Sequence, residues 1–190
     1  MIFLTDRDVA DRIAQGIPAG ELYKPPSRIR LCEAQVIIDE VETAFRDVQL
    51  GNGVGLFEGQ AIDDYESEDI QKHVREKDEK ADWKKIRTSD MDRCYSSLSF
   101  FDAEGMRFHL PAFVCSDLRG DSGVELEFSL VGFGDQKLGA YKRSKFSLLN
   151  FTQRTAIARY LKFLAEDIDG AFSRKAIQQS LATFWETDLD

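Results

Sequence analysis

The sequence predicts an α+β domain in which helices at both ends pack on a small central sheet of about three or four strands. Apolar residues recur at helical spacing near both ends of the chain, and central segments alternate apolar with polar side chains, the two-residue period of a half-buried strand. No repeat or linker divides the chain. Residues 1–190 are therefore expected to form a single domain.

The N-terminal third is predicted to be helical. Thr5 and Asp8 have the spacing of a capping box and predict a short helix that Gly16 ends. Apolar residues then recur at helical spacing from Leu31 to Val48, with acidic residues filling most of the other face. This second pattern is the strongest indication of a helix in the chain.

The next stretch is predicted to be irregular or exposed. Four glycines between Gly51 and Gly59 predict a loop or an irregular strand. Residues 67–80 are almost wholly charged and polar, which favours an exposed helix or a mobile, inserted excursion over an element of the core.

Three segments predict the strands of the sheet. Apolar and polar residues alternate over residues 106–110 and over residues 124–130, and Phe146 with Leu148 suggests a third strand. Pro111 is expected to end the first of them. Short helices are predicted on either side of that strand, over residues 89–101 and 112–118.

The C-terminal part is predicted to return to helices. Asn150 and Gln153 have capping-box spacing before an apolar stripe that extends to Ile168, and a last helix is expected from Ser173 to Trp185.

The charge balance bounds the kind of partner. The chain holds 34 acidic and 25 basic residues, a net charge of −9, which argues against nucleic acid and anionic membranes as partners. Residues 1–70 alone sum to −9, whereas residues 137–175 sum to +6. Such a gradient indicates either mutual neutralisation across the folded surface or an acidic face offered to a cationic partner. No targeting segment or membrane span is apparent, so a cytoplasmic location is expected.

Several short segments are typical of one known family: Glu58 with Ile62-Asp63-Asp64-Tyr65, Asp82-Trp83, Ser97-Leu98-Ser99-Phe100, Arg107-Phe108 and Leu110-Pro111-Ala112-Phe113. In these segments the chain resembles a bacterial family of unknown function, DUF6714, over roughly residues 30–167. The chain has His109 where that family tends to place an aromatic residue. The resemblance implies no catalytic or binding residue.

One cluster has the residue types of a metal site. Asp69 and His73 lie four residues apart, so on a helix they share a face and could bind a divalent ion together with Asp63 or Asp64. The alternative is that these acids complement the positive N-terminal end of a helix. No cofactor is predicted.

A second group could support catalysis. On a strand, Arg107 and His109 would share one face, where Arg107 could bind an anion and His109 could transfer a proton, with Cys94 or Cys115 as nucleophile. The alternative is an arginine paired with acidic neighbours beside a surface histidine.

The favoured hypothesis is a non-enzymatic binding protein, of the inhibitor or immunity type, whose acidic half steers it onto a protein with a basic surface. Asp63, Asp64, Tyr65 and Trp83 are the predicted contact residues, because aromatic side chains beside acids suit an interface. A small hydrolase or metal-dependent enzyme that uses either cluster is the alternative. A homodimer formed through the terminal helices is a third hypothesis.

Overall fold

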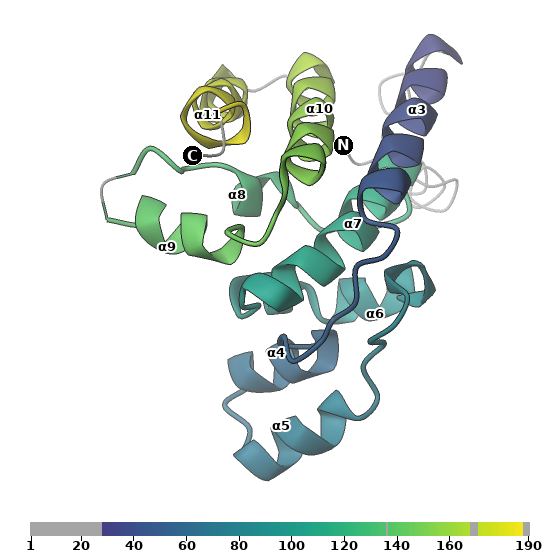
Figure 1. Ribbon diagram of the computed structural model, residues 1–190, viewed down its shortest axis with the longest axis vertical. Coiled ribbons are helices and arrows are strands. Elements are labelled where there is room, and N and C mark those ends of the chain that lie inside the picture. The colour runs from purple at the N-terminus through teal and green to yellow at the C-terminus, as the bar shows by residue number, and fades with distance from the viewer. Residues whose placement is uncertain (1–27, 136, 168–170, 188–190) are drawn as a thin grey trace, which may run out of the picture.

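The structure of the protein is a computed structural model that describes residues 28–135, 137–167 and 171–187, and all regular elements in these residues are helical (Figure 1). The predicted α+β class is therefore wrong, since no strand occurs in the described ranges. The helices are α3 (Arg28–Ala44), α4 (Leu56–Asp63), α5 (Glu68–Arg75), α6 (Thr88–Arg93), α7 (Ala103–Arg119), α8 (Glu127–Leu130), α9 (Gly139–Lys145), α10 (Phe151–Asp167) and α11 (Ala171–Ser180). Short 3₁₀ turns span Trp83–Lys85 and Tyr95–Ser99, and a π-helical turn, Leu181–Trp185, continues α11.

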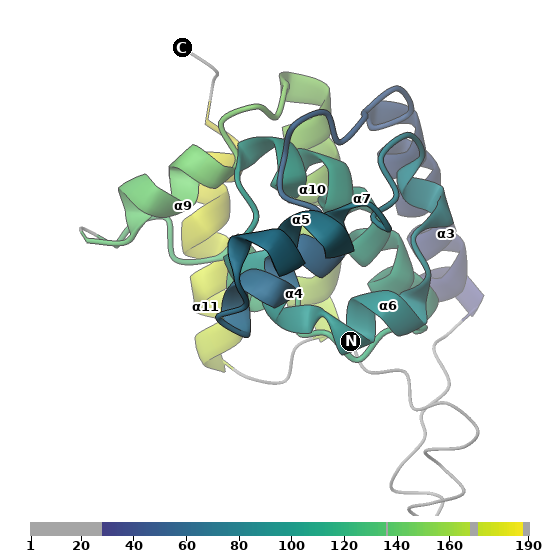
Figure 2. The ribbon, with the colours of Figure 1, turned by 90° about the horizontal axis from the view of Figure 1, so that it is seen from below.

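Helix α7 forms the centre of the fold. It packs on α3, on α9 and on the turn Trp83–Lys85, and in Figure 2 the α4–α5 pair lies in front of it. Its side chains from Phe108 to Leu118 are all buried. A helix that neighbours cover on every side needs apolar residues all round, so it shows no helical stripe in its sequence.

This burial explains why the first predicted strand is wrong. Residues 106–110 alternate apolar and polar types, but His109 is buried and Arg107 half-buried, so the alternation does not mark an exposed face. Pro111 lies inside α7 and removes one backbone donor without ending the helix. Residues 112–118, predicted as a separate helix, are the second half of α7.

The other two predicted strands are also wrong. Over residues 124–130 an extended loop leads into α8, where Leu126 and Leu130 are buried four residues apart while Phe128 is 59% exposed. Near residue 146 the chain makes a turn after α9, which buries Phe146 and leaves Leu148 exposed. In both places the buried side chains lie on a turn of helix or loop, and no strand pairs with these residues in the described ranges.

The strongest helix predictions are confirmed. The stripe from Leu31 to Val48 becomes α3 and its C-terminal turn, and the stripe before Ile168 becomes α10, which lies beside α3 in Figure 1. The predicted capping box forms: Gln153 N donates to Asn150 Oδ1 at 2.9 Å, and Asn150 N donates to Gln153 Oε1 at 3.1 Å. The predicted last helix corresponds to α11 and its π-helical turn. The helix predicted after Thr5 lies outside the described residues.

A tight loop, residues 51–55, attaches the α4–α5 pair to α7. A Cβ atom on Gly53 would lie 2.4 Å from the backbone nitrogen of Gly105, so only glycine fits this contact. The Asp102 carboxylate caps α7 by accepting from Gly105 N at 2.8 Å, and the same oxygen accepts from Val54 N at 3.0 Å. The Arg75 guanidinium, at the end of α5, donates to the carbonyls of Gly51 and Gly53. These contacts, all made to backbone groups of residues 51–55 or of Gly105, tie the start of α4 and the end of α5 to the N-terminal end of α7.

Candidate functional site

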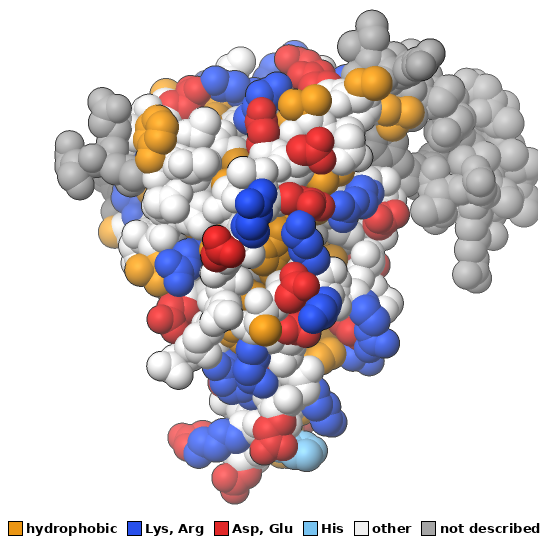
Figure 3. Space-filling view, turned by 45° about the vertical axis from the view of Figure 1, so that its right-hand side comes forward, with side chains coloured by type: hydrophobic (Ala, Val, Ile, Leu, Met, Phe, Trp, Pro, Cys, Tyr) orange, Lys and Arg blue, Asp and Glu red, His pale blue; other side chains and the backbone are white. Residues whose placement is uncertain are grey.

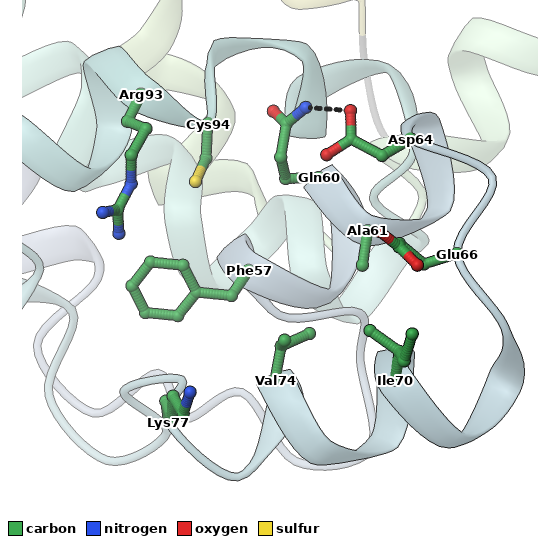
Figure 4. Close-up of a pocket in the computed structure, with 10 residues that line it drawn as sticks. All are labelled: Phe57, Gln60, Ala61, Asp64, Glu66, Ile70, Val74, Lys77, Arg93 and Cys94. Carbon is green, nitrogen blue, oxygen red and sulfur yellow. Dashed lines mark hydrogen bonds between the residues drawn. The ribbon is translucent and has the colours of Figure 1, made fainter.

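A groove lies between α4 and α5 (Figure 4). Its volume is about 450 Å³. We call it the α4–α5 groove, and its lining residues are Phe57, Gln60, Ala61, Asp64, Glu66, Ile70, Val74, Lys77, Arg93 and Cys94.

The floor of the groove is apolar. Phe57 and Ala61 of α4 face Ile70 and Val74 of α5, and Cys94 also lines the groove, on the Phe57 side (Figure 4). Ile70 and Val74 stand four residues apart, so they share one face of α5. These two residues belong to residues 67–80, the almost wholly charged and polar segment predicted as an exposed helix or a mobile excursion, and their helical spacing is the signal that could have identified them.

The rim carries opposite charges at its two ends. Asp64 and Glu66 lie at one end, and Lys77 and Arg93 lie at the other (Figure 4). Asp64 also accepts a hydrogen bond from the Gln60 side chain at 3.0 Å, which holds its carboxylate over the groove. The groove can therefore bind an apolar group and orient it by charge at either end.

Tyr65 stands directly beside the acidic end. Its side chain is 96% exposed, and its backbone has φ +57°, in the left-handed region. Glu66 N donates to Ala61 O at 2.9 Å and Tyr65 N to Ile62 O at 3.2 Å, the two bonds of a Schellman motif. Glycine usually occupies the left-handed position of this motif. A tyrosine there carries backbone strain of about 1–2 kcal/mol without any packing of its own side chain.

The turn that joins α4 to α5 concentrates negative charge. We call residues 63–69 the acidic turn; its acids are Asp63, Asp64, Glu66, Glu68 and Asp69. Within the described part of the chain, Glu68 is the one member of this set in an ion pair, with Lys72 at 3.7 Å, and both side chains are exposed. Figure 3 shows charged side chains crowding this lower end of the molecule.

Elsewhere the acidic N-terminal half is partly neutralised. Glu40 of α3 pairs with Arg159 of α10 at 2.5 Å, and Glu42 pairs with Lys84 at 2.7 Å and with Arg119 at 3.2 Å. Of these cations only Arg159 belongs to the basic segment 137–175, so one ion pair supports mutual neutralisation across the fold. In the acidic turn four of the five acids have no ion pair within the described part of the chain.

The residues predicted as metal ligands lie around this turn. Asp63 ends α4, whereas Asp69 and His73 lie on α5. His73 Nδ1 is 3.7 Å from Glu76 Oε2, and both side chains are exposed. Over the described ranges no group of three or more His, Cys, Asp or Glu residues is arranged to hold a metal ion.

The residues predicted for catalysis are separated. On a helix, residues two apart point in nearly opposite directions, and Arg107 lines a different cavity, beside Asn150, from the one that His109 lines. His109 is 1% exposed and stacks on Phe101 with ring centroids 4.3 Å apart. Burial lowers the pKa of His109 to about 4.

Both candidate nucleophiles are buried thiols. Burial raises the pKa of Cys94, and it raises the pKa of Cys115 to about 12. Since the thiolate is the reactive form, neither side chain is activated in this structure.

Trp83, predicted as a contact residue, is part of the core. It is 3% exposed, and its indole Nε1 donates to Phe45 O at 2.9 Å. The remaining predicted contact residues, Asp63, Asp64 and Tyr65, lie together at the acidic end of the α4–α5 groove.

In the described residues the fold is all-helical, and its α4–α5 groove has an apolar floor with opposite charges at the two ends of its rim. The chain belongs to a family of unknown function, DUF6714, whose model matches residues 33–189. The expected resemblance is thereby confirmed, and the match extends through α11. No curated protein and no solved structure matched the chain. None of the helices in the described ranges has the length and apolar character that a membrane crossing requires.

Proposed function

We propose that the protein is a non-enzymatic binding module of the bacterial cytoplasm that docks a basic segment of a partner protein in the α4–α5 groove. The observation that carries this proposal is Tyr65, a large aromatic side chain that is 96% exposed on a strained backbone. Strain of this kind persists at functional positions because another demand outweighs its cost to stability. Tyrosine is among the residues that contribute most to protein interfaces.

Charge supports the nature of the partner. Five acidic residues of the acidic turn flank Tyr65 in the sequence, and in the described chain Glu68 alone of them forms an ion pair. Lysine or arginine residues of a partner would pair with Asp64 and Glu66, while an apolar side chain between them enters the groove beside Ile70 and Val74. Charges at the rim of an interface act mainly on the association rate, which falls as salt is added.

The opposite end of the groove supports a fixed orientation. Lys77 and Arg93 would repel the basic part of the partner and favour a carboxylate. The Arg93 guanidinium lies 5.4 Å from the centre of the Phe57 ring and 3.2 Å from Asp90, so it is held in place. A bound segment therefore carries its basic residues towards Tyr65.

The state of the titratable groups favours binding over turnover. A histidine with a pKa near 4 is a weak base at neutral pH, and a cysteine with a raised pKa is a weak nucleophile. His109 also lines a different cavity from the one that Asp64 and Glu66 line.

The proposal can be tested by selecting ligands from a phage-displayed library of random 12-residue peptides, with the whole protein immobilised. We expect the selected peptides to place lysine or arginine beside one large apolar residue. Their affinity is expected to fall by roughly tenfold or more in the double variant Tyr65→Ala, Asp64→Lys, which corresponds to the loss of one interface anchor. Binding is also expected to weaken steeply as salt rises.

Phe128 provides the matched control. It is 59% exposed and directly follows Glu127, with Glu125 three residues before it, so it offers an aromatic side chain beside acids at a different place in the fold. Phe128→Ala is expected to bind the selected peptides as the wild type does. Selection of acidic peptides, or equal loss of binding in both variants, would refute the proposed site.

A further inference from the structure

A second, more enclosed cavity lies next to the α4–α5 groove and shares Phe57 and Lys77 with it. Its volume is about 240 Å³. We call it the His109 pocket, and its lining residues are Leu56, Phe57, Lys77, Asp78, Glu79, Lys85, Ile86, Arg87, Asp90 and His109.

His109 lines this pocket, and one of its ring nitrogens accepts no hydrogen bond from a described residue. Its Nδ1 lies 2.7 Å from the Gly105 carbonyl oxygen, and because a carbonyl only accepts, Nδ1 carries the proton. Burial lowers the pKa of His109 to about 4, so the ring is neutral at pH 7 and Nε2 keeps its lone pair. No described residue donates to Nε2. The ring is held in this orientation by its stack on Phe101.

The interior of the pocket is otherwise acidic. Asp78 and Asp90 are both buried and line the cavity. Asp78 Oδ1 accepts from Phe57 N at 2.7 Å, and Asp90 accepts from Arg87 Nε at 2.8 Å and from Arg93 at 3.2 Å. A carboxylate has about four acceptor positions, so each can accept a further bond. The two carboxylates and the unprotonated ring nitrogen of His109 are therefore hydrogen-bond acceptors for the donors of a ligand.

The mouth of the pocket is basic. Lys77, Lys85 and Arg87 are exposed and line the cavity. Glu79, the remaining acid, turns its Oε1 to the backbone N–H groups of residues 80–82, at 2.9–3.1 Å, and so lies away from the mouth. The three cations and three acids of the lining cancel in total. Asp78 is buried, whereas Lys77 and Lys85 are exposed, and Arg87 reaches inward to the buried Asp90.

We propose that the His109 pocket binds a free α-amino acid. The zwitterion matches the lining, because its ammonium group donates to Nε2 of His109 and to the inner carboxylates, while its carboxylate pairs with the cations of the mouth. Leu56, Phe57 and Ile86 supply an apolar wall for a small side chain. A volume of about 240 Å³ is below the range of pockets for drug-sized ligands, which suits a ligand of this size.

The test follows the His109 Nε2 resonance by NMR in protein labelled with ¹⁵N-histidine, during titration with glycine, L-alanine and L-leucine. A hydrogen bond donated to Nε2 shifts that resonance, so we expect a saturable shift with at least one of the three. Acetate and methylamine each carry half of the zwitterion. We expect them to bind at least roughly tenfold more weakly, because each leaves one charged surface of the pocket unpaired.

Two variants assign the interaction. His109→Phe keeps an aromatic ring against Phe101 but removes the acceptor, and it should abolish the amino-acid-dependent shift of the Leu56 amide. Lys85→Gln should weaken binding several-fold, whereas the adjacent Lys84→Gln, outside the cavity, should not. The proposal is overturned if none of the three amino acids shifts the wild-type His109 resonance at roughly 50 mM, a concentration beyond specific affinities. It is equally overturned if acetate or methylamine alone gives the same shift. Since these outcomes concern the wild type, they stand even if His109→Phe fails to fold.

Discussion

Replacing Tyr65 by glycine should make the protein more stable and less able to bind. Tyr65 occupies the left-handed position of the Schellman motif that ends α4, with φ +57°. A left-handed conformation raises the free energy of an L-residue by about 1–2 kcal/mol, and glycine removes that penalty. Glycine also gains about 0.5–1 kcal/mol of conformational entropy in the unfolded chain, which opposes the gain.

The net magnitude follows from the exposure of the side chain. Because Tyr65 is 96% exposed, its removal leaves no cavity and breaks no buried contact. The expected gain in the free energy of unfolding is therefore about 0.5–1 kcal/mol, or a rise in Tm of roughly 1–4 °C for a domain of this size. Urea unfolding followed by circular dichroism measures the free energy, and peptide binding measures the function.

The variant Tyr65→Ala separates the effect of the backbone conformation on stability from the effect of the side chain on binding. Alanine keeps the left-handed strain, so its stability should stay within about 0.5 kcal/mol of the wild type, while its loss of binding should equal that of Tyr65→Gly. The reasoning is refuted if Tyr65→Gly unfolds at lower urea concentration than the wild type. The functional assignment fails if both variants bind as the wild type does.

Two further predictions concern buried groups. Because the folded pKa of His109, about 4, is below the unfolded value of 6.5, the stability due to this group is complete above pH 6.5 and is lost as pH falls towards 4. Between pH 6.5 and pH 4 the free energy of unfolding of the wild type should fall by about 3 kcal/mol more than that of His109→Phe, whereas His73→Gln should follow the wild type. Parallel plots of the free energy of unfolding against pH for all three proteins would contradict this. Gly55→Ala would place its Cβ 1.9 Å from the Asp78 carboxylate and should lower the free energy of unfolding by about 1–3 kcal/mol, measured against Gly123→Ala, whose Cβ meets nothing within 4 Å.

The amphipathic helices could be predicted because each keeps one polar face. In α3 and α10 the buried positions repeat every three to four residues, and the Asn150–Gln153 box marks where α10 begins. Helix α7 could not be predicted in this way, since its neighbours cover it on all sides. A polar residue of α7 can be buried where it finds a hydrogen-bond partner, as His109 does at the Gly105 carbonyl. Polar residues therefore do not mark an exposed face of this helix, and its sequence shows no helical period.

Only part of the candidate site follows from sequence. The acids of residues 63–69 and Tyr65 are visible as a cluster, and the structure brings them together at one end of the groove. The burial of Trp83 depends on a long-range hydrogen bond to Phe45, which local composition cannot reveal. The His109 pocket likewise combines residues from α4, the loop after α5, α6 and α7, so it exists only in the folded chain.

The attachment of α5 has a consequence for how the groove works. This helix has no buried residue, and its firmest link is at its C-terminal end, where Arg75 reaches the carbonyl of Gly53 and Glu58 at 2.6 Å. Its other end joins α4 through the exposed turn at Tyr65. Segments with few buried contacts open locally at a free energy below that of global unfolding. We therefore expect the amides of α5 to open at a lower free energy than those of α7, with the Arg75 contacts as the last link to be lost.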